Sequence, residues 1–272
     1  MTRAVLSFPT AAISLVAPPE VLAEVEALYP GAPTKRRFPA EESTLSVTAG
    51  EGRYRLETTP GPPRRFRTAA DAALALALEI ERLVLARRGD RPALHAGGVE
   101  VDGGAWLLAG RAESGKTSTT FQLAELGCPL LCEEIAILDP ENRVLPFPQA
   151  LRLEPDFVEE ARRDGPPRGE LTAGPDRLLR YRPPRRARAP RPLTALLLPR
   201  YRPSEPPRLA RREPAESILE LLGHCFEPLA DEEPLFDRIL TLAHSTPIHE
   251  LVYPDAGSAR RLLLELLDRG PE

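Results

Sequence analysis

The sequence predicts an α/β protein with a phosphate-loop domain built on a mixed sheet, and three observations predict it. Residues 110–117 match the phosphate-cradling pattern Gly-x-x-x-x-Gly-Lys-[Ser/Thr] at every fixed position. A turn over 102–104 joins two apolar stretches, so the strand before the motif has an antiparallel neighbour. Period-two alternation on both sides of residues 50–52 predicts a further hairpin. We therefore expect a small N-terminal α+β domain over 1–90 and the phosphate-loop domain over 91–272.

The leading domain is expected to combine a small sheet with two helices. Pro19 opens the first helix, because proline suits the first helical turn. Thr68 caps the second, which is expected to bury Leu74, Leu78 and Leu85 on one face. In chain order the expected elements are a strand over 11–16, a helix over 19–28, strands over 45–48 and 53–57, and a helix over 69–88.

The loop motif lies between an expected strand and an expected helix. Apolar residues 105–109 lead directly into Gly110, and a helix follows over 117–126. This order lets the loop N–H groups and the helix N-terminus converge on a phosphate. The other elements expected here are strands over 94–101, 130–138, 143–148, 193–198 and 248–253, and helices over 215–224, 234–243 and 256–268.

Residues 160–192 differ from the rest of the domain, because arginine and proline dominate them and hydrophobic periodicity is lost. We interpret this part of the chain as a mobile surface segment without regular structure. Its Arg-rich portion, 177–191, has two interpretations. It is either a solvated loop or a lid that binds phosphate or recognises an acidic acceptor.

The composition narrows the possible partners and location. A net charge of −4 argues against a nucleic-acid partner. Three cysteines are too few for a disulfide scaffold. The longest apolar stretch, 69–78, contains Asp71 and is shorter than the ~20 residues that span a bilayer. The start of the chain does not resemble a signal peptide, so we expect no membrane contact and a cytoplasmic location.

Lysine is rare in this chain, and one of its lysines lies in the loop. The chain has 36 Lys+Arg residues, but only Lys35 and Lys116 are lysines. An ammonium group on a flexible stem reaches the outer phosphates of a nucleotide where a planar guanidinium would not fit. We predict that Lys116 contacts those phosphates and that Thr117 holds Mg²⁺. The predicted nucleotide-binding residues are Gly110, Arg111, Ala112, Glu113, Ser114, Gly115, Lys116, Thr117 and Ser118.

Glu113 stands inside the loop, where a small residue is more usual. Its carboxylate repels phosphate unless it points outward or pairs with Arg111.

Two acidic residues and a histidine are candidates for the chemistry. Glu133 and Glu134 follow a short apolar strand, and adjacent strand residues face opposite ways. One can therefore face a metal and the other an acceptor; the alternative is a solvated strand end. His95 lies on the strand expected beside the loop-bearing strand. It is either a proton-transfer partner or phosphate contact, or a histidine packed in the core.

A second group of possible metal ligands is interpreted as packing. His224, Cys225, His244 and His249 fit no common zinc spacing and fall on apolar elements.

The order of these motifs resembles the kinase domain of HPr kinase/phosphorylase. The residues that carry the resemblance are His95-Ala-Gly-Gly-Val99, Leu107 to Thr117, Leu130-Leu-Cys-Glu-Glu-Ile135, Leu138-Asp-Pro140 and Val144 to Pro148. His95 precedes Lys116 by 21 positions, and Glu133 follows Lys116 by 17. The chain is more similar to the HPr-kinase-related proteins of bacterial biosynthetic clusters, some of which phosphorylate a peptide. Residues 1–90 resemble the variable leading domain of those proteins.

The resemblance implies a fold similar to the nucleotide domain of phosphoenolpyruvate carboxykinase, with a mixed sheet. It also implies ATP, Mg²⁺, a serine-type hydroxyl acceptor and a homo-oligomer. Glu133 matches an acidic residue, usually Asp, that takes the hydroxyl proton; Glu134 matches a second acidic residue near the metal. His95 matches a histidine beside the reacting phosphate. Glu133 in place of Asp, and Glu113 in place of the usual Gly, are departures from the family pattern.

These features lead to one function hypothesis and two alternatives. We expect an ATP-dependent kinase that phosphorylates a serine-type hydroxyl on a peptide or small protein, with Glu133, His95 and Lys116 as catalytic residues. The metal residues are then Thr117 and Glu134. The alternatives are a small-molecule hydroxyl kinase on the same scaffold and a nucleotide-binding module without catalysis. No segment for the reverse, phosphorolytic reaction is found, so phosphorylase activity is not predicted.

Overall fold

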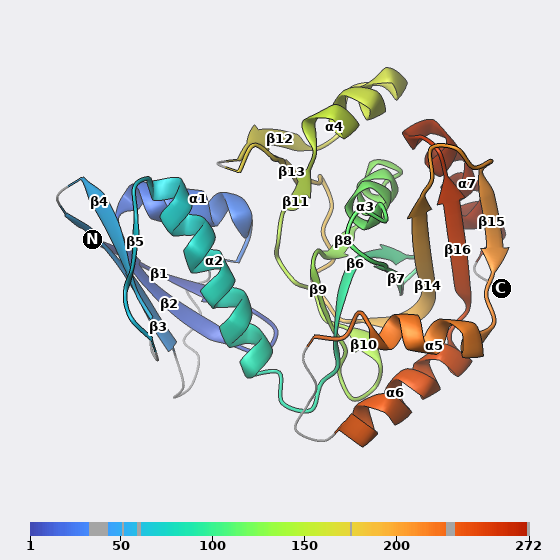
Figure 1. The fold of residues 1–272 in the computed structure, drawn as a ribbon, viewed down its shortest axis with the longest axis horizontal. Coiled ribbons are helices and arrows are strands. Elements are labelled where there is room, and N and C mark those ends of the chain that lie inside the picture. The colour runs from blue at the N-terminus through green and yellow to red at the C-terminus, as the bar shows by residue number, and fades with distance from the viewer. Residues whose placement is uncertain (33–42, 51, 59–60, 175, 227–231, 271–272) are drawn as a thin grey trace. The chain divides into compact units, whose positions relative to one another are not determined.

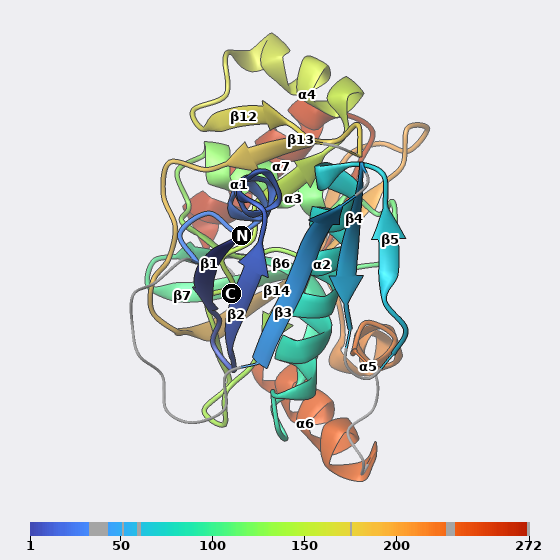
Figure 2. The same cartoon turned by 90° about the vertical axis from the view of Figure 1, so that its left-hand side faces the viewer.

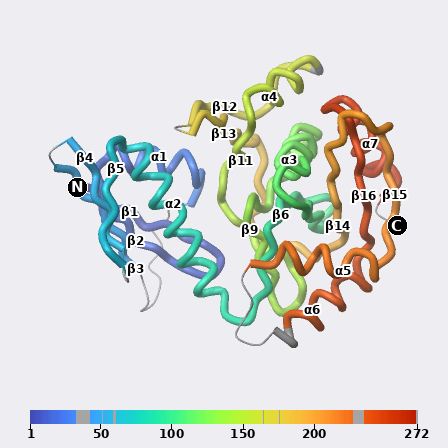
Figure 3. Tube along the Cα trace, viewed as in Figure 1, coloured from blue at the N-terminus to red at the C-terminus, as the bar shows by residue number. Residues whose placement is uncertain are grey.

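The computed structural model describes residues 1–32, 43–50, 52–58, 61–174, 176–226 and 232–270, and the chain divides into two compact units. We call them the N-terminal unit and the C-terminal unit. The N-terminal unit comprises Met1–Gly89, Pro148–Ala150 and Gly174–Asp176. The C-terminal unit comprises Asp90–Phe147, Leu151–Ala173 and Arg177–Glu272. Figure 3 traces the path of the chain through both.

The N-terminal unit is a five-stranded sheet with two helices on one face (Figures 1 and 2). Its strand order is β1-β2-β3-β4-β5, with β2 and β3 parallel and the other neighbours antiparallel. Its elements are β1 (Thr2–Ser7), β2 (Ala12–Ala17), α1 (Pro19–Leu28), β3 (Ser43–Gly50), β4 (Arg53–Glu57), β5 (Arg64–Phe66) and α2 (Ala69–Ala86). The expected helices and the hairpin at residues 50–52 are confirmed.

Helix α2 begins as predicted but buries a different face. The hydroxyl oxygen of Thr68 accepts a hydrogen bond from the backbone N–H of Asp71 at 3.0 Å. The buried face carries Leu76, Ile80 and Val84, whereas Leu78 is 59% exposed. The expectation that Leu78 is buried is wrong. Alanine and leucine residues occur on several sides of α2, so the apolar pattern of the helix does not indicate which face is buried.

The C-terminal unit contains an eight-stranded mixed sheet with helices on both sides (Figures 1 and 2). Its elements up to β13 are β6 (Ala93–Val101), β7 (Gly104–Ala109), α3 (Lys116–Glu125), β8 (Leu130–Cys132), β9 (Ile135–Ile137), β10 (Arg143–Val144), β11 (Leu151–Leu153), α4 (Pro155–Ala161), a 3₁₀ turn (Arg162–Asp164), β12 (Glu170–Ala173) and β13 (Leu179–Arg182). The rest are β14 (Arg191–Tyr201), β15 (Arg208–Arg211), α5 (Pro214–Leu222), α6 (Glu232–Ser245), β16 (Ile248–Tyr253) and α7 (Ala256–Arg269).

The main sheet has the strand order β15-β16-β14-β7-β6-β8, and β9 and β10 pair with β6 and β14. Strand β7 runs antiparallel to β6 and parallel to β14, which itself is parallel to β16. The prediction of a mixed sheet around the loop-bearing strand is therefore confirmed. The turn between β6 and β7 has Asp102 and Gly103 at φ +48° and +82°, the left-handed values that a tight hairpin turn requires.

Apolar side chains on both faces of this sheet explain its position between helices. Every residue of β7 is buried, including Trp106 and Leu108, as expected of a strand covered on both sides. Trp106 and Leu108 belong to a core cluster with Phe121 of α3 and Leu263 of α7. Within the described ranges, no helix combines the length and hydrophobicity needed to cross a membrane.

The structure corrects the prediction for residues 160–192. Strands β12 and β13 form a three-stranded sheet with β11, so this segment has regular structure. Tyr181 of β13 is fully buried, and its hydroxyl group donates a hydrogen bond to the buried Glu125 of α3. The sequence pattern missed these strands because few of their side chains are apolar. The strand expected over 143–148 is also shorter, since only β10 is regular.

Candidate functional site

The 110–117 loop connects β7 directly to α3, and two of its glycines are required by close contacts. Gly115 has φ +94°, and a Cβ atom there would lie 1.8 Å from the hydroxyl oxygen of Tyr253. A Cβ atom at Gly110 would lie 2.5 Å from Oγ of Ser114. Tyr253, at the end of β16, donates to the carbonyl oxygen of Gly115 at 3.2 Å. The loop is thus shaped by a neighbouring strand as well as by its own sequence.

Lys116 folds back over the loop that precedes it. Its Nζ donates to the carbonyl oxygens of Gly110 at 2.7 Å and Arg111 at 3.2 Å. Partial burial lowers the pKa of Lys116, while the charges of Glu134 and Glu133 oppose that shift. The ammonium group therefore lies close to both acidic candidates.

The remaining predicted loop residues divide into exposed and buried ones. Glu113 is exposed at φ +62°, a left-handed conformation that glycine adopts most easily. Among the described residues no ion pair joins Glu113 to Arg111, and Glu113 lines a cavity beside the loop together with Arg111. Arg111 and Ala112 are also exposed, Ser114 is buried, and Ser118 lies in the first turn of α3.

Glu133 is buried beside the start of α3. It is 2% exposed, and its Oε1 accepts a hydrogen bond from the hydroxyl of Thr117 at 2.8 Å. Its other oxygen, Oε2, is buried and has no hydrogen-bond partner among the described residues. Burial and the neighbouring charge of Glu134 raise the pKa of Glu133 to about 8. A solvated strand end is therefore excluded for this residue.

Glu134 contacts His95 on the neighbouring strand β6. His95 Nε2 lies 2.5 Å from Glu134 Oε2, and Arg152 lies 3.6 Å from the other oxygen. The hydrogen bond with His95 lowers the pKa of Glu134. The side chain of His95 is 38% exposed, so it is not a histidine packed in the core.

The two glutamates do not lie in a strand, which corrects the argument from alternating faces. They form a bend between β8 and β9, and the N–H of Ile135 donates to the carbonyl oxygen of Glu133 at 2.7 Å. Glu134 has φ +63° within this bend. The bend directs one carboxylate to Thr117 and the other to His95.

Gly97 of β6 completes this cluster. A Cβ atom at this position would lie 2.3 Å from Oγ1 of Thr120 and 3.3 Å from Oε2 of Glu133. A larger residue would fill the space beside the unpartnered carboxylate oxygen. Within the described part of the chain, no group of three His, Cys, Asp or Glu side chains could hold a metal ion alone. A hard divalent cation at this place needs oxygen ligands from a bound phosphate as well.

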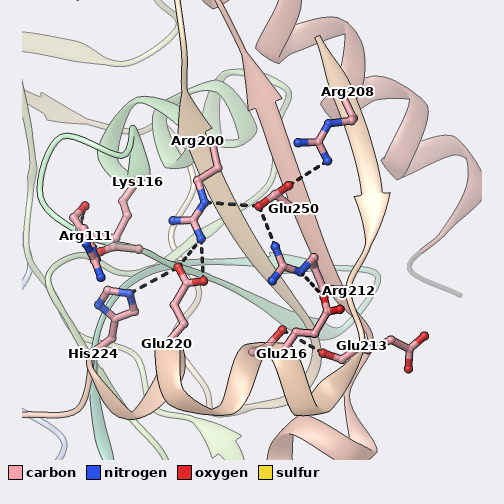
Figure 4. Close-up of polar contacts among 12 residues, drawn as sticks. Arg111, Lys116, Arg200, Arg208, Arg212, Glu213, Glu216, Glu220, His224 and Glu250 are labelled. Atoms are coloured by element: carbon pink, nitrogen blue, oxygen red, sulfur yellow. Dashed lines mark hydrogen bonds and ion pairs between the residues drawn. The ribbon is translucent and has the colours of Figure 1, made fainter. Parts of the chain in front are cut away.

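A set of charged residues beside the loop was not predicted from the sequence. Arg200, near the end of β14, makes two hydrogen bonds to Glu220 of α5 at 2.5 and 2.6 Å. Figure 4 shows Glu220 between Arg200 and His224, with Arg111 and Lys116 drawn above His224, and Nε2 of His224 lies 3.9 Å from Oε1 of Glu220. His224 is 7% exposed, and its Nε2 has no hydrogen-bond partner among the residues described.

Burial lowers the pKa of His224, and the charge of Glu220 opposes that shift. Arg200 was missed because its place beside the loop depends on strand pairing: it lies near the end of β14, which is parallel to β7, and the carboxyl ends of parallel strands lie at one edge of a sheet.

Comparisons with known proteins give one distant similarity. No family model matches the chain, and no curated protein matches it. Among solved structures, the chain is similar to the Hpr(Ser) kinase/phosphatase from Coxiella burnetii, with 15% identity and a TM-score of 0.32. The match covers 65% of this chain and 93% of that chain. At this identity and score the similarity carries no argument about the activity or substrate of this chain.

Proposed function

We propose that this protein is an ATP- and Mg²⁺-dependent kinase that transfers the γ-phosphoryl group to a serine-type hydroxyl on a peptide or small protein. The observation that carries the proposal is the contact between Thr117 and Glu133 next to Lys116. A loop hydroxyl, a loop lysine and a buried carboxylate at one helix N-terminus are the groups that phosphoryl transfer requires.

The residues present fit a magnesium nucleotide. Lys116 now donates to two loop carbonyl oxygens, and the same ammonium group can turn to β- and γ-phosphate oxygens. Loop N–H groups and the start of α3 favour the same anion. The buried Oε2 of Glu133 has no hydrogen-bond partner among the described residues, and a carboxylate oxygen is a ligand that Mg²⁺ accepts. When bound, Mg²⁺ supplies charge neutralisation between the phosphate groups.

Two assignments of roles to Glu133 and Glu134 are compatible with these contacts. In the first, Glu133 takes the hydroxyl proton while Glu134 and Thr117 hold Mg²⁺; the raised pKa of Glu133 supports it. In the second, Glu133 shares the metal with Thr117, while the pair of Glu134 and His95 takes the proton. The hydrogen bond from Thr117 to Glu133 and the contact of Glu134 with His95 favour the second.

Magnesium titrations of two variants separate these assignments. Glu133→Gln and Glu134→Gln both remove one negative charge and keep the side-chain shape. The variant at the metal needs more Mg²⁺ for half-maximal rate. The variant at the proton-accepting residue has a lower kcat, while its Mg²⁺ requirement stays at the wild-type value.

The test of the proposed function is a phosphorylation assay with a matched lysine control. The protein is incubated with ATP, Mg²⁺ and the peptides encoded near its gene, and phosphopeptide is detected by its mass. Lys116→Ala should abolish transfer, whereas Lys35→Ala, which changes the other lysine of the chain, should not. Full activity of Lys116→Ala contradicts the proposal. ATP binding with no transfer to any hydroxyl favours the non-catalytic module, and transfer to small molecules alone favours the small-molecule kinase.

A further inference from the structure

The sheet of the N-terminal unit has one face that helices α1 and α2 do not cover (Figures 1 and 2). Leu56 of β4 is fully buried on the helix side. Because successive strand residues face opposite ways, Arg53 and Arg55 lie on the other side, and both are exposed. Thr48 of β3 and Arg65 of β5 are the cross-strand partners of Arg55 and lie on the same side. We call the surface formed by Thr48, Arg53, Arg55 and Arg65 the arginine face.

A cavity of about 280 Å³ lies at the arginine face. Its described lining contains three arginines and no acidic residue: Thr48, Ala49, Gly50, Arg53, Tyr54, Arg55 and Arg65. Arg55 lies 2.7 Å from Glu57, but both side chains are close to half exposed, so solvent weakens that pair. Over residues 51–67 as a whole, five arginines and two glutamates give a net charge of +3, in a chain whose net charge is −4. The face therefore keeps positive charge when both glutamates are counted.

The register of the strands places two of these positive charges directly opposite each other. Arg55 and Arg65 are cross-strand partners in an antiparallel pair, where like charges destabilise a sheet. A carboxylate between the two guanidinium groups would remove that repulsion and accept charge-assisted hydrogen bonds from both. The pair therefore favours an anionic ligand.

The spacing along β4 suits an extended peptide. Arg53 and Arg55 are two residues apart on one strand, which places their Cα atoms about 7 Å apart. Side chains two residues apart in an extended peptide have the same spacing. Carboxylates at alternate positions of a peptide can therefore meet successive arginines, and the exposed hydroxyl of Thr48 can hydrogen-bond to the peptide backbone.

A single-stranded nucleic acid fits this face less well, because the aromatic side chains of β4 and β5 already have partners. The hydroxyl of Tyr54 donates to Glu20 of α1 at 3.0 Å. The guanidinium group of Arg64 lies 5.4 Å from the centroid of the Phe66 ring. Bases bind such surfaces by stacking on free aromatic rings. The observations therefore favour an acidic peptide.

We propose that the arginine face binds an extended acidic segment of the acceptor, with Asp or Glu at alternate positions. Arg55 and Arg65 share one carboxylate, and Arg53 contacts the next carboxylate along the segment. That the segment belongs to the acceptor rests on the proposed kinase function, whereas its binding needs neither nucleotide nor phosphoryl transfer. The N-terminal unit thus recognises a part of the acceptor other than the residue that carries the hydroxyl.

Fluorescence anisotropy with the full chain at low ionic strength tests the binding. Three labelled peptides of equal length are compared: one has Glu at alternate positions, one has Gln at those positions, and one has the same number of Glu residues in a consecutive run. The peptide with alternating Glu should bind most tightly.

Variants of the face assign that binding to its arginines. Arg53→Gln and Arg65→Gln should each weaken it about fivefold, the effect of one exposed ion pair. Arg82→Gln, at an exposed arginine of α2, should leave it unchanged. Arg65→Gln removes the like-charged partner of Arg55 and so should not lower Tm, which separates a loss of binding from a loss of folding.

Three results would overturn the proposal. Equal binding of the alternating Glu and Gln peptides, or unchanged binding in both arginine variants, removes the site. Equal binding of the alternating and consecutive Glu peptides removes the extended geometry. If labelled oligothymidine binds more tightly than any peptide and loses affinity in the same variants, the face is a nucleic-acid site.

Kinetics separate this inference from the proposed function. The alternating Glu segment is joined to a serine peptide that the protein phosphorylates. It should lower the KM for that peptide without changing kcat, and Arg65→Gln should remove the effect. An unchanged KM overturns the acceptor as the ligand and leaves the kinase function standing. Binding that needs Arg53 and Arg65, without phosphoryl transfer to any hydroxyl, supports the site and contradicts the kinase function.

Discussion

Replacing Gly115 by alanine tests whether contacts from β16 shape the 110–117 loop. The new Cβ atom would lie 1.8 Å from the hydroxyl oxygen of Tyr253, and φ is +94°. Tyr253 would have to move, and its hydroxyl group contacts both the carbonyl oxygen of Gly115 at 3.2 Å and Oγ1 of Thr119 at 3.1 Å. The substitution thus adds backbone strain and removes two hydrogen bonds.

The magnitude follows from these two contributions. Left-handed backbone costs a residue with a Cβ atom ~1–2 kcal/mol, and each lost hydrogen bond costs ~0.5–1.5 kcal/mol. Gly115→Ala should therefore lower the free energy of unfolding by about 2–5 kcal/mol. Gly103→Ala is the matched control, because Gly103 has φ +82° and nothing within 4 Å of its Cβ position. It should lose only the strain contribution, about 1–2 kcal/mol.

Thermal unfolding measures the loss of stability, and binding of a fluorescent ATP analogue measures the effect on the loop. The difference between the variants, about 1–3 kcal/mol, corresponds to roughly 2–12 °C in Tm. Gly115→Ala should also lose nucleotide binding, which Gly103→Ala should retain. In a double-mutant cycle, Gly115→Ala and Tyr253→Phe should cost less together than the sum of the two, because both remove the same hydrogen bonds. Equal stability and equal binding in Gly115→Ala and Gly103→Ala would refute this reasoning.

Three further predictions concern groups away from the loop. Burial raises the pKa of the Cys128 thiol to about 11, so alkylation at pH 8 should be about two orders of magnitude slower than for a free thiol. The rate, followed by peptide mass, should rise up to about pH 11; a plateau near pH 8.5 contradicts the prediction. Glu250→Gln should cost about 3–5 kcal/mol in denaturant unfolding because its buried carboxylate contacts three arginines, whereas the exposed Glu265→Gln should stay within about 0.5 kcal/mol. Tyr181→Phe should cost about 1–2 kcal/mol because it removes the hydrogen bond to buried Glu125, and an unchanged unfolding midpoint would show that this bond contributes nothing.

Much of the C-terminal unit could be predicted because its signals are local. The turn at Asp102 and Gly103 determines an antiparallel pair, and the apolar residues before Gly110 determine a buried strand that enters the loop. His95 was also expected on a strand beside the loop-bearing strand, and β6 and β7 are neighbours in one sheet.

Other features could not be predicted because they depend on partners distant in sequence. The strands within 160–192 are stabilised by pairing with β11 and by Tyr181 packing on α3, not by an apolar pattern of their own. The tertiary structure brings Arg200 of β14 to the same cavity as Arg111 of the loop and His224, and no motif links these positions. His224 was assigned to packing, yet its buried Nε2 lies 3.9 Å from Oε1 of Glu220 and has no hydrogen-bond partner among the described residues.

By itself, the sequence determined the strand–loop–helix unit, the hairpin before it and the Thr68 cap of α2. These features depend on backbone preferences and hydrogen bonds within a few residues of each other. Only the tertiary structure decided which face of α2 is buried, where the carboxylates of Glu133 and Glu134 point, and which charges surround the loop. The burial of a side chain and its ion pairs depend on which element packs against it. The order of the strands in the sheet determines which elements are neighbours.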